Sequence, residues 1–106
     1  GDYTSYVNAL ADALRPEYEA IASTGVMLQV DAPDLAMGRH TRFHDLSDAE
    51  FLELIFKTNM EALNRALANV PTPRTRVHVC WGNYPGPHTK DIDAALLWPH
   101  LVNLKA

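Results

Sequence analysis

Two short segments with alternating apolar and polar residues constrain the fold more than any other feature of the chain. We predict strands at residues 26–31 and 76–81, where valine and leucine recur at every second position. Because successive side chains of a strand point to opposite faces, the polar residues Asp31, His78 and Cys80 lie away from the apolar face of their strand. An apolar face packs against helices, and such a polar face is typical of a barrel interior or a ligand crevice.

Three helices are predicted around these strands. The first, over residues 3–23, has apolar residues at steps of three and four, and Pro16 is expected to kink or split it because proline has no N–H to donate. The segment Ser47-Asp48-Ala49-Glu50 has the pattern of a capping box, which begins a helix over residues 48–70. The remaining elements are a helix over residues 91–100 and the start of a third strand at residues 101–104.

The order of these elements indicates an α/β fold. Strands that are separated by helices of this length pair in parallel and are joined by right-handed crossovers. In folds of this kind, ligands and catalytic groups lie at the C-terminal ends of the strands. Asp31, His78 and Cys80 all occupy such strand ends, which makes them candidate functional residues.

Length and composition exclude several classes of protein. The 106 residues suffice for one domain at most, and 47% hydrophobic with 21% charged residues is close to the average of soluble globular proteins. No apolar run reaches the ~18–20 residues that span a bilayer, so we expect no membrane partner. The net charge of −4 and the lack of a basic run argue against nucleic-acid binding. The one cysteine cannot form an internal disulfide, which suits a reducing cytoplasm.

The segment His78-Val79-Cys80 is the sharpest chemical feature of the sequence. Residues two apart on a strand point the same way, with ~6.5–7 Å between their Cα atoms. At that spacing an imidazole nitrogen and a thiolate can bind one zinc ion, at ~2.0–2.1 Å and ~2.3 Å. The alternative is a buried cysteine beside a histidine. A cysteine-nucleophile enzyme is disfavoured, because the sequence offers no third group that would orient the imidazole.

Other residues near the strand ends are candidates for substrate binding. Asp31 can bind a substrate ammonium group, or it can cap the turn that Pro33 begins. Trp81 and Asn83 lie in the segment rich in proline and glycine after the second strand, and they are candidates to line a pocket. Three loop histidines could offer further ligands, but each is better explained as a surface residue; they are His40, His44 and His88.

Residues 26–36 (VMLQVDAPDLA) and 77–84 (VHVCWGNY) resemble the catalytic domain of cobalamin-independent methionine synthase and its single-domain relatives, which include the epoxyalkane:coenzyme M transferases. The resemblance implies a TIM barrel that transfers an alkyl group to a zinc-bound thiolate, as in a 5-methyltetrahydropteroyltriglutamate–homocysteine methyltransferase. It also implies that His78 and Cys80 are the first two zinc ligands. Asp31 would then hold the amino group of the substrate.

The resemblance further implies that residues 1–106 are a single fragment of a larger barrel. A complete (β/α)8 barrel takes ~250 residues, so the expected fold is a partial TIM barrel of about two to three β/α units with parallel strands. The family completes its zinc site with a glutamate and a second cysteine from later strands. The parent would therefore be a zinc-dependent S-alkyl- or methyltransferase. This chain by itself would be inactive and would bind Zn²⁺ weakly or not at all.

The expected partners of the parent are a small-molecule thiol acceptor and an alkyl donor. Ala32 stands where methionine synthases have a glutamate, so a parent resembling the epoxyalkane:coenzyme M transferases is one alternative. Another is a non-catalytic partial barrel whose open strand edges lead to self-association, or to packing on the missing remainder of the barrel. Uroporphyrinogen decarboxylase, which shares the broad superfamily and needs no metal, is disfavoured by the pair His78 and Cys80.

Overall fold

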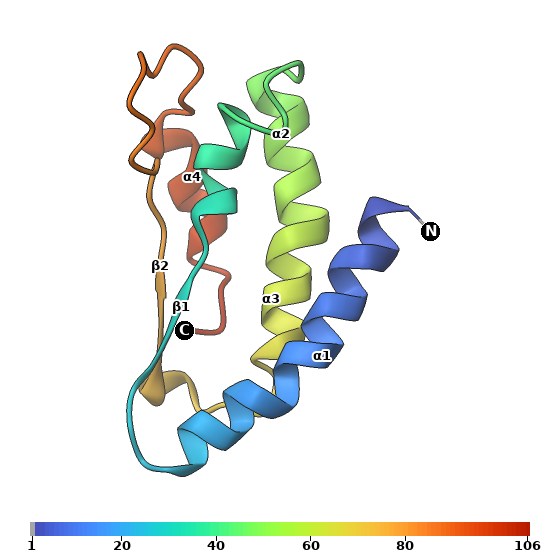
Figure 1. The fold of residues 1–106 in the computed structure, drawn as a ribbon, viewed down its shortest axis with the longest axis vertical. Helices are drawn as coiled ribbons and strands as arrows, with labels where there is room; N and C mark the ends of the chain where they lie inside the picture. Colours follow the sequence, from blue (N-terminus) through green and yellow to red (C-terminus); the bar gives the residue numbers. More distant parts are fainter. Residues whose placement is uncertain (1) are drawn as a thin grey trace.

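A computed structural model describes residues 2–106, with helices packed on one face of a short parallel sheet (Figure 1). In chain order the helices and strands are α1 (Tyr3–Ser23), β1 (Leu28–Asp31), α2 (Asp48–Leu54), α3 (Glu61–Ala66), β2 (Thr75–His78) and α4 (Ala94–Leu101). Short 3-10 turns cover Pro33–Leu35, Met37–Arg39 and Thr72–Arg74, and a π-helical segment, η3, covers Ile55–Met60.

The expected fold class, a partial TIM barrel, is wrong. Over residues 2–106 the sheet has only two strands of four residues each, and helices and loops make up the rest of a small domain. The third strand expected at residues 101–104 is replaced by helical turns. Helix α4 runs to Leu101, and the Leu104 N–H then donates to the Leu101 carbonyl at 3.1 Å.

The two strands pair in parallel, as the order of elements predicts. Asp31 lies opposite His78, and the Ala32 N–H donates a 2.9 Å hydrogen bond to the His78 carbonyl. The ladder stops here because the chain turns at Pro33, which has no N–H to continue it. The strand predicted over residues 76–81 therefore ends early, at His78, after beginning at Thr75. The strand predicted over residues 26–31 ends at Asp31 as predicted but begins only at Leu28.

The two faces of the sheet separate apolar from polar residues, as the alternation predicts. Leu28 and Val30 are buried, whereas Gln29 and Asp31 are exposed. On the exposed face the Arg76 Nε donates to the Gln29 Oε1 at 2.7 Å, which links the two strands. This polar face is open to solvent, whereas the sequence predicted the enclosed interior of a barrel.

Helix α1 continues through Pro16, and its axis bends along its length instead of splitting (Figure 1). The helix packs against α3 through small residues, because Ala11 lies in one apolar cluster with Ala62 and Ala66. Several large apolar side chains of α1 stay partly exposed as a result, and they are Tyr6, Leu10, Leu14 and Ile21.

The predicted capping box is confirmed at the start of α2. The Ser47 Oγ accepts a 3.2 Å bond from the Glu50 N–H, and the Ser47 N–H donates a 2.7 Å bond to the Glu50 carboxylate. Helix α2, the segment η3 and helix α3 follow one another without interruption, and the helix ends at Ala66, before the predicted residue 70. The helix predicted from residue 91 begins later, where the Asp93 carboxylate caps α4.

Within residues 2–106, none of the helices has the length and apolar character needed to cross a membrane.

Candidate metal centre

Asp31, His78 and Cys80 come together at the C-terminal ends of the two strands. A ligand atom from each side chain lies within 4.8 Å of the other two. Asp31 and His78 are paired positions of the parallel ladder, so their side chains leave the sheet on the same face. Cys80 follows two residues after His78 and keeps that orientation. The sequence therefore predicted that His78, at the end of β2, and Cys80, just after it, share one face, and the register of the sheet adds the carboxylate from β1.

A backbone hydrogen bond between the two strand ends holds this arrangement in place. The hydrogen bond from the Ala32 N–H to the His78 carbonyl joins the residue after Asp31 to the residue that carries the imidazole. Asp31 and His78 are exposed and Cys80 is partly buried, so a ligand can approach the group from solvent.

The three donors are compatible with one metal ion. In a tetrahedral site with bonds of ~2.0–2.3 Å, neighbouring ligand atoms lie about 3.3–3.8 Å apart. Small side-chain rotations would bring atoms that lie within 4.8 Å of one another to this spacing. With three protein ligands, a fourth position stays open for water or substrate. The group could therefore hold a metal ion and present it to a small molecule.

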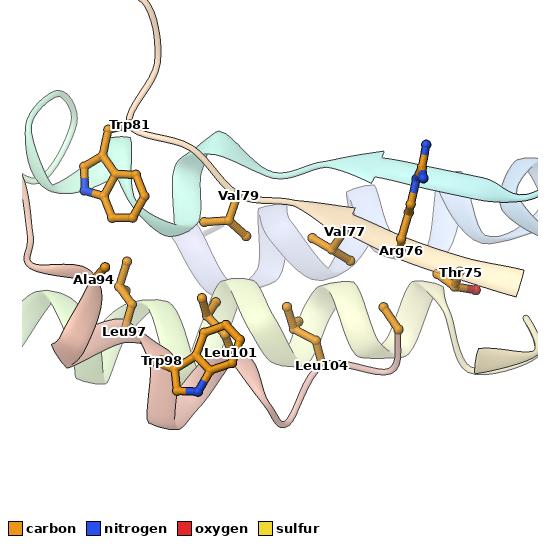
Figure 2. Close-up of a pocket in the computed structure, with 11 residues that line it drawn as sticks. Thr75, Arg76, Val77, Val79, Trp81, Ala94, Leu97, Trp98, Leu101 and Leu104 are labelled. Atoms are coloured by element: carbon orange, nitrogen blue, oxygen red, sulfur yellow. The ribbon is translucent and has the colours of Figure 1, made fainter. Parts of the chain in front are cut away.

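Trp81 lies on the other side of β2 and does not join this group. Figure 2 shows Val77, Val79 and Trp81 pointing toward α4, whereas Arg76 points away from it. The Trp81 indole N–H donates to the Ile92 carbonyl at 2.8 Å, which anchors the ring against the segment before α4. The alternation along residues 76–81 could have predicted this position, because Trp81 stands two residues after Val79 and so faces the same way as the valines.

Asn83 is also separate from the three donors. It is an exposed residue of the loop between β2 and α4, and it follows Gly82, whose positive φ of 72° turns the chain. The substrate-binding residues suggested by the sequence are thus distributed over different surfaces. Asp31 is placed among potential metal ligands, Trp81 packs near α4, and Asn83 lies in an exposed loop.

Two of the three loop histidines, His40 and His88, form a second cluster that is distinct from the metal group. The His40 and His88 rings stack with centroids 5.4 Å apart. His88 is hydrogen bonded to the Asp91 carboxylate at 2.8 Å and to the Tyr84 carbonyl at 3.2 Å. His44 pairs with its neighbour Asp45 at 2.9 Å. These contacts tie the loop after β1 to the loop after β2, but among residues 2–106 only Asp31, His78 and Cys80 meet the spacing of a three-ligand site.

No family model, curated protein or solved structure matches this chain. The resemblance to the methionine synthase family therefore stays a prediction.

Proposed function

We propose that this chain binds zinc through Asp31, His78 and Cys80 and that the metal activates a substrate thiol for alkyl transfer. The observation that carries the proposal is the convergence of three different donors within 4.8 Å at adjacent strand ends. The sequence resemblance supplies the reaction class, a methyl or alkyl transfer of the kind that methionine synthases perform. Asp31 changes its proposed role, from substrate binding to the third metal ligand. With three potential ligands in one chain, the proposal replaces the sequence-based expectation that this chain is inactive and binds zinc weakly or not at all.

The donor set favours zinc over other divalent metals. A thiolate and an imidazole are common zinc ligands, whereas magnesium and calcium prefer oxygen donors alone. Zinc, when bound, lowers the pKa of a thiol at its open position and keeps that thiol deprotonated near neutral pH. A reduced cysteine is needed for this role, which is consistent with a cytoplasmic location.

Each of the three candidate ligands would contribute a different donor to such a site. His78 offers a neutral imidazole and Cys80 a thiolate, while Asp31 contributes a negative charge from the neighbouring strand. The exposed face leaves the fourth position accessible to a small thiol. Arg76 and Gln29, hydrogen bonded at 2.7 Å, occupy the same face two residues before His78 and Asp31, and they hold the two strands in register beside the site.

Metal binding is tested by equilibrium dialysis against Zn²⁺ followed by elemental analysis. We expect one zinc per chain, and we expect each of His78→Ala, Cys80→Ser and Asp31→Asn to weaken binding at least about tenfold. His44→Ala and Asp45→Asn are matched controls, because they change the same residue types in an exposed loop. Equal zinc content in the triad variants and the controls would refute the assignment.

Thiol activation is tested separately with the zinc-loaded chain. The rate at which methyl iodide methylates mercaptoethanol, with release of iodide, is measured in the presence and in the absence of the zinc-loaded wild-type chain. We expect the wild-type chain to accelerate the reaction and to keep Cys80 unmodified, as read by mass spectrometry. Stoichiometric zinc without acceleration would identify a purely structural metal and would reject the transferase.

A second candidate function is self-association through the free edge of β2. Among the described residues, 2–106, the sheet has two strands, so β2 pairs on one side only. Beside its free edge lies a cavity of about 550 Å³ that β2 and α4 line with apolar residues (Figure 2). Trp98 at this cavity is 67% exposed. The occupant we propose is a second copy of the chain, and sedimentation should show a dimer that Trp98→Glu dissociates. A monomeric wild-type chain at all concentrations would exclude this function.

A further inference from the structure

Arg42 carries a positive charge that no carboxylate neutralises within residues 2–106. Its guanidinium carbon lies 4.8 Å from the centroid of the Tyr3 ring and 5.9 Å from that of Phe43. Other arginines do form ion pairs: Arg39 with Asp48 at 3.0 Å and Arg65 with Asp12 at 2.7 Å. Stacking on aromatic rings fixes the plane of the Arg42 guanidinium and leaves its N–H groups available to a ligand.

A cavity of about 420 Å³ adjoins this side chain. It lies between the first turns of α1 and the loop after β1, and its volume is within the range of small-molecule sites. Aromatic and aliphatic side chains form most of its wall, and they include Tyr3, Tyr6, Val7, Leu10, Met37 and Phe43. These surfaces suit an apolar body about the size of an aromatic ring.

A partly buried hydrogen-bond network holds one wall of the cavity. The Tyr3 hydroxyl donates to the Asn59 Oδ1 at 3.0 Å, and the Asn59 Nδ2 donates to the Asp34 carboxylate at 2.6 Å. Asn59 is only 8% exposed and lies in the π-helical segment η3. Single π-helical turns inside α-helices are rare and occur frequently at functional sites. The network fixes Tyr3, on which Arg42 stacks, and so pre-organises the cation.

We propose that this cavity binds a small monocarboxylate carried on a ring-sized apolar body. The planar guanidinium of Arg42 matches a carboxylate in a bidentate geometry, and the aromatic wall receives the rest of the ligand. Asp34 also lines the cavity, and its charge disfavours ligands with a second negative group. The inference does not depend on zinc, because neither Arg42 nor the aromatic wall belongs to the metal group.

Chemical-shift titration with 3-phenylpropionate tests the site. Two probes of nearly the same shape serve as comparisons: the neutral 3-phenylpropanamide and the cationic 3-phenylpropylamine. We expect the carboxylate to shift resonances of α1 and of the loop after β1, and the amide to bind at least about tenfold more weakly. Equal affinity for the three probes, or no shift with the carboxylate at millimolar concentration, would overturn the proposal.

Variants test the contribution of individual charges to binding while changing the shape of the cavity little. Arg42→Gln should weaken 3-phenylpropionate at least tenfold, whereas Arg74→Gln, the same change in the turn before β2, should leave its affinity unchanged. Asp34→Asn should strengthen binding a few-fold, because it removes the negative charge from the wall. Equal losses in both arginine variants would indicate a non-specific charge effect and would reject the site. Circular dichroism of each variant checks that the fold is kept.

Discussion

Asp31 and His78 lie opposite each other at the last rung of the parallel ladder, although a loop and a complete helical crossover separate them in the sequence. Their side chains therefore leave the same face of the sheet and meet Cys80 there. The group exists only when both strands have paired in this register. Metal binding at these residues is for that reason coupled to folding of the crossover between them.

Zinc should raise the thermal stability of the wild-type chain. A ligand that binds only the folded state at a hundred times its dissociation constant adds about 2.7 kcal/mol, which is on the order of 10 °C in Tm for a domain of this size. Calorimetry with and without zinc measures the shift. His78→Ala should melt at the same temperature under both conditions, while His44→Ala should keep the full increase. A rise of equal size in His78→Ala would show that zinc binds elsewhere.

Two adjacent leucines of α4 should differ sharply in their contribution to stability. Leu97 is 2% exposed in the core, whereas Leu96 is 44% exposed. Leu97→Ala should lower the free energy of unfolding by ~2–5 kcal/mol, because it leaves a cavity in a packed core. Leu96→Ala should change it by no more than about 0.5 kcal/mol. Urea denaturation compares the two, and similar losses would mean that α4 does not pack as described.

The capping box should make stability depend on acid pH. The hydrogen bond from the Ser47 backbone N–H lowers the pKa of the Glu50 carboxyl below its ordinary value. Since the folded-state pKa lies below the unfolded one, the bond stabilises the fold above the unfolded pKa, and this contribution is lost as the pH falls through the folded pKa. The free energy of unfolding of Glu50→Gln, measured by denaturation, should be lower than that of the wild type at neutral pH. The two values should converge in acid.

Controls for the capping box come from the same helical region. Ser47→Ala removes the other half of the box and should cost ~1 kcal/mol. Glu61→Gln removes one carboxylate charge farther along without touching the cap. If Glu61→Gln reproduces the pH response of Glu50→Gln, the effect belongs to net charge and not to the hydrogen bond.

Gly82 should be the less replaceable of two glycines with positive φ. Both Gly25, at φ 91°, and Gly82, at φ 72°, adopt a conformation that costs other residues of order 1 kcal/mol or more. A Cβ on Gly82 would also overlap the Met37 sulfur, whereas one on Gly25 has only an ordinary contact at 3.5 Å with Arg74. Gly82→Ala should therefore destabilise the chain more, and Met37→Ala should recover part of that loss. Equal costs at both glycines would contradict the close approach of Met37.

Local patterns were enough to predict much of the fold. The alternation in residues 26–31 gave the buried and exposed faces of β1, because burial there depends on side-chain parity. The spacing of Ser47 and Glu50 predicted the capping box, which needs only residues within one turn. The pair His78 and Cys80 was predicted on one face for the same reason.

The size of the sheet was beyond such patterns. A strand persists only where a neighbour offers hydrogen bonds, and the turn at Pro33 withdraws that neighbour from the segment after His78. The position of Asp31 as a third donor depends on cross-strand register, which no local motif encodes. That Arg42 pairs with aromatic rings and with no carboxylate of residues 2–106 likewise depends on which side chains the loop brings near it.

Side chains alternate strictly between two faces along β2 and the residues just after it. The packing of the valines and the position of the candidate metal ligands therefore depend on the same register. Deleting one residue within the strand would turn His78 and Cys80 toward α4 and send the valines to solvent. Insertions and deletions here would therefore be eliminated by their effect on folding, whether or not the metal is needed. Point substitutions at His78 or Cys80 keep the register and would not exchange the two faces of the strand, so they test the metal group without reversing the packing of the valines.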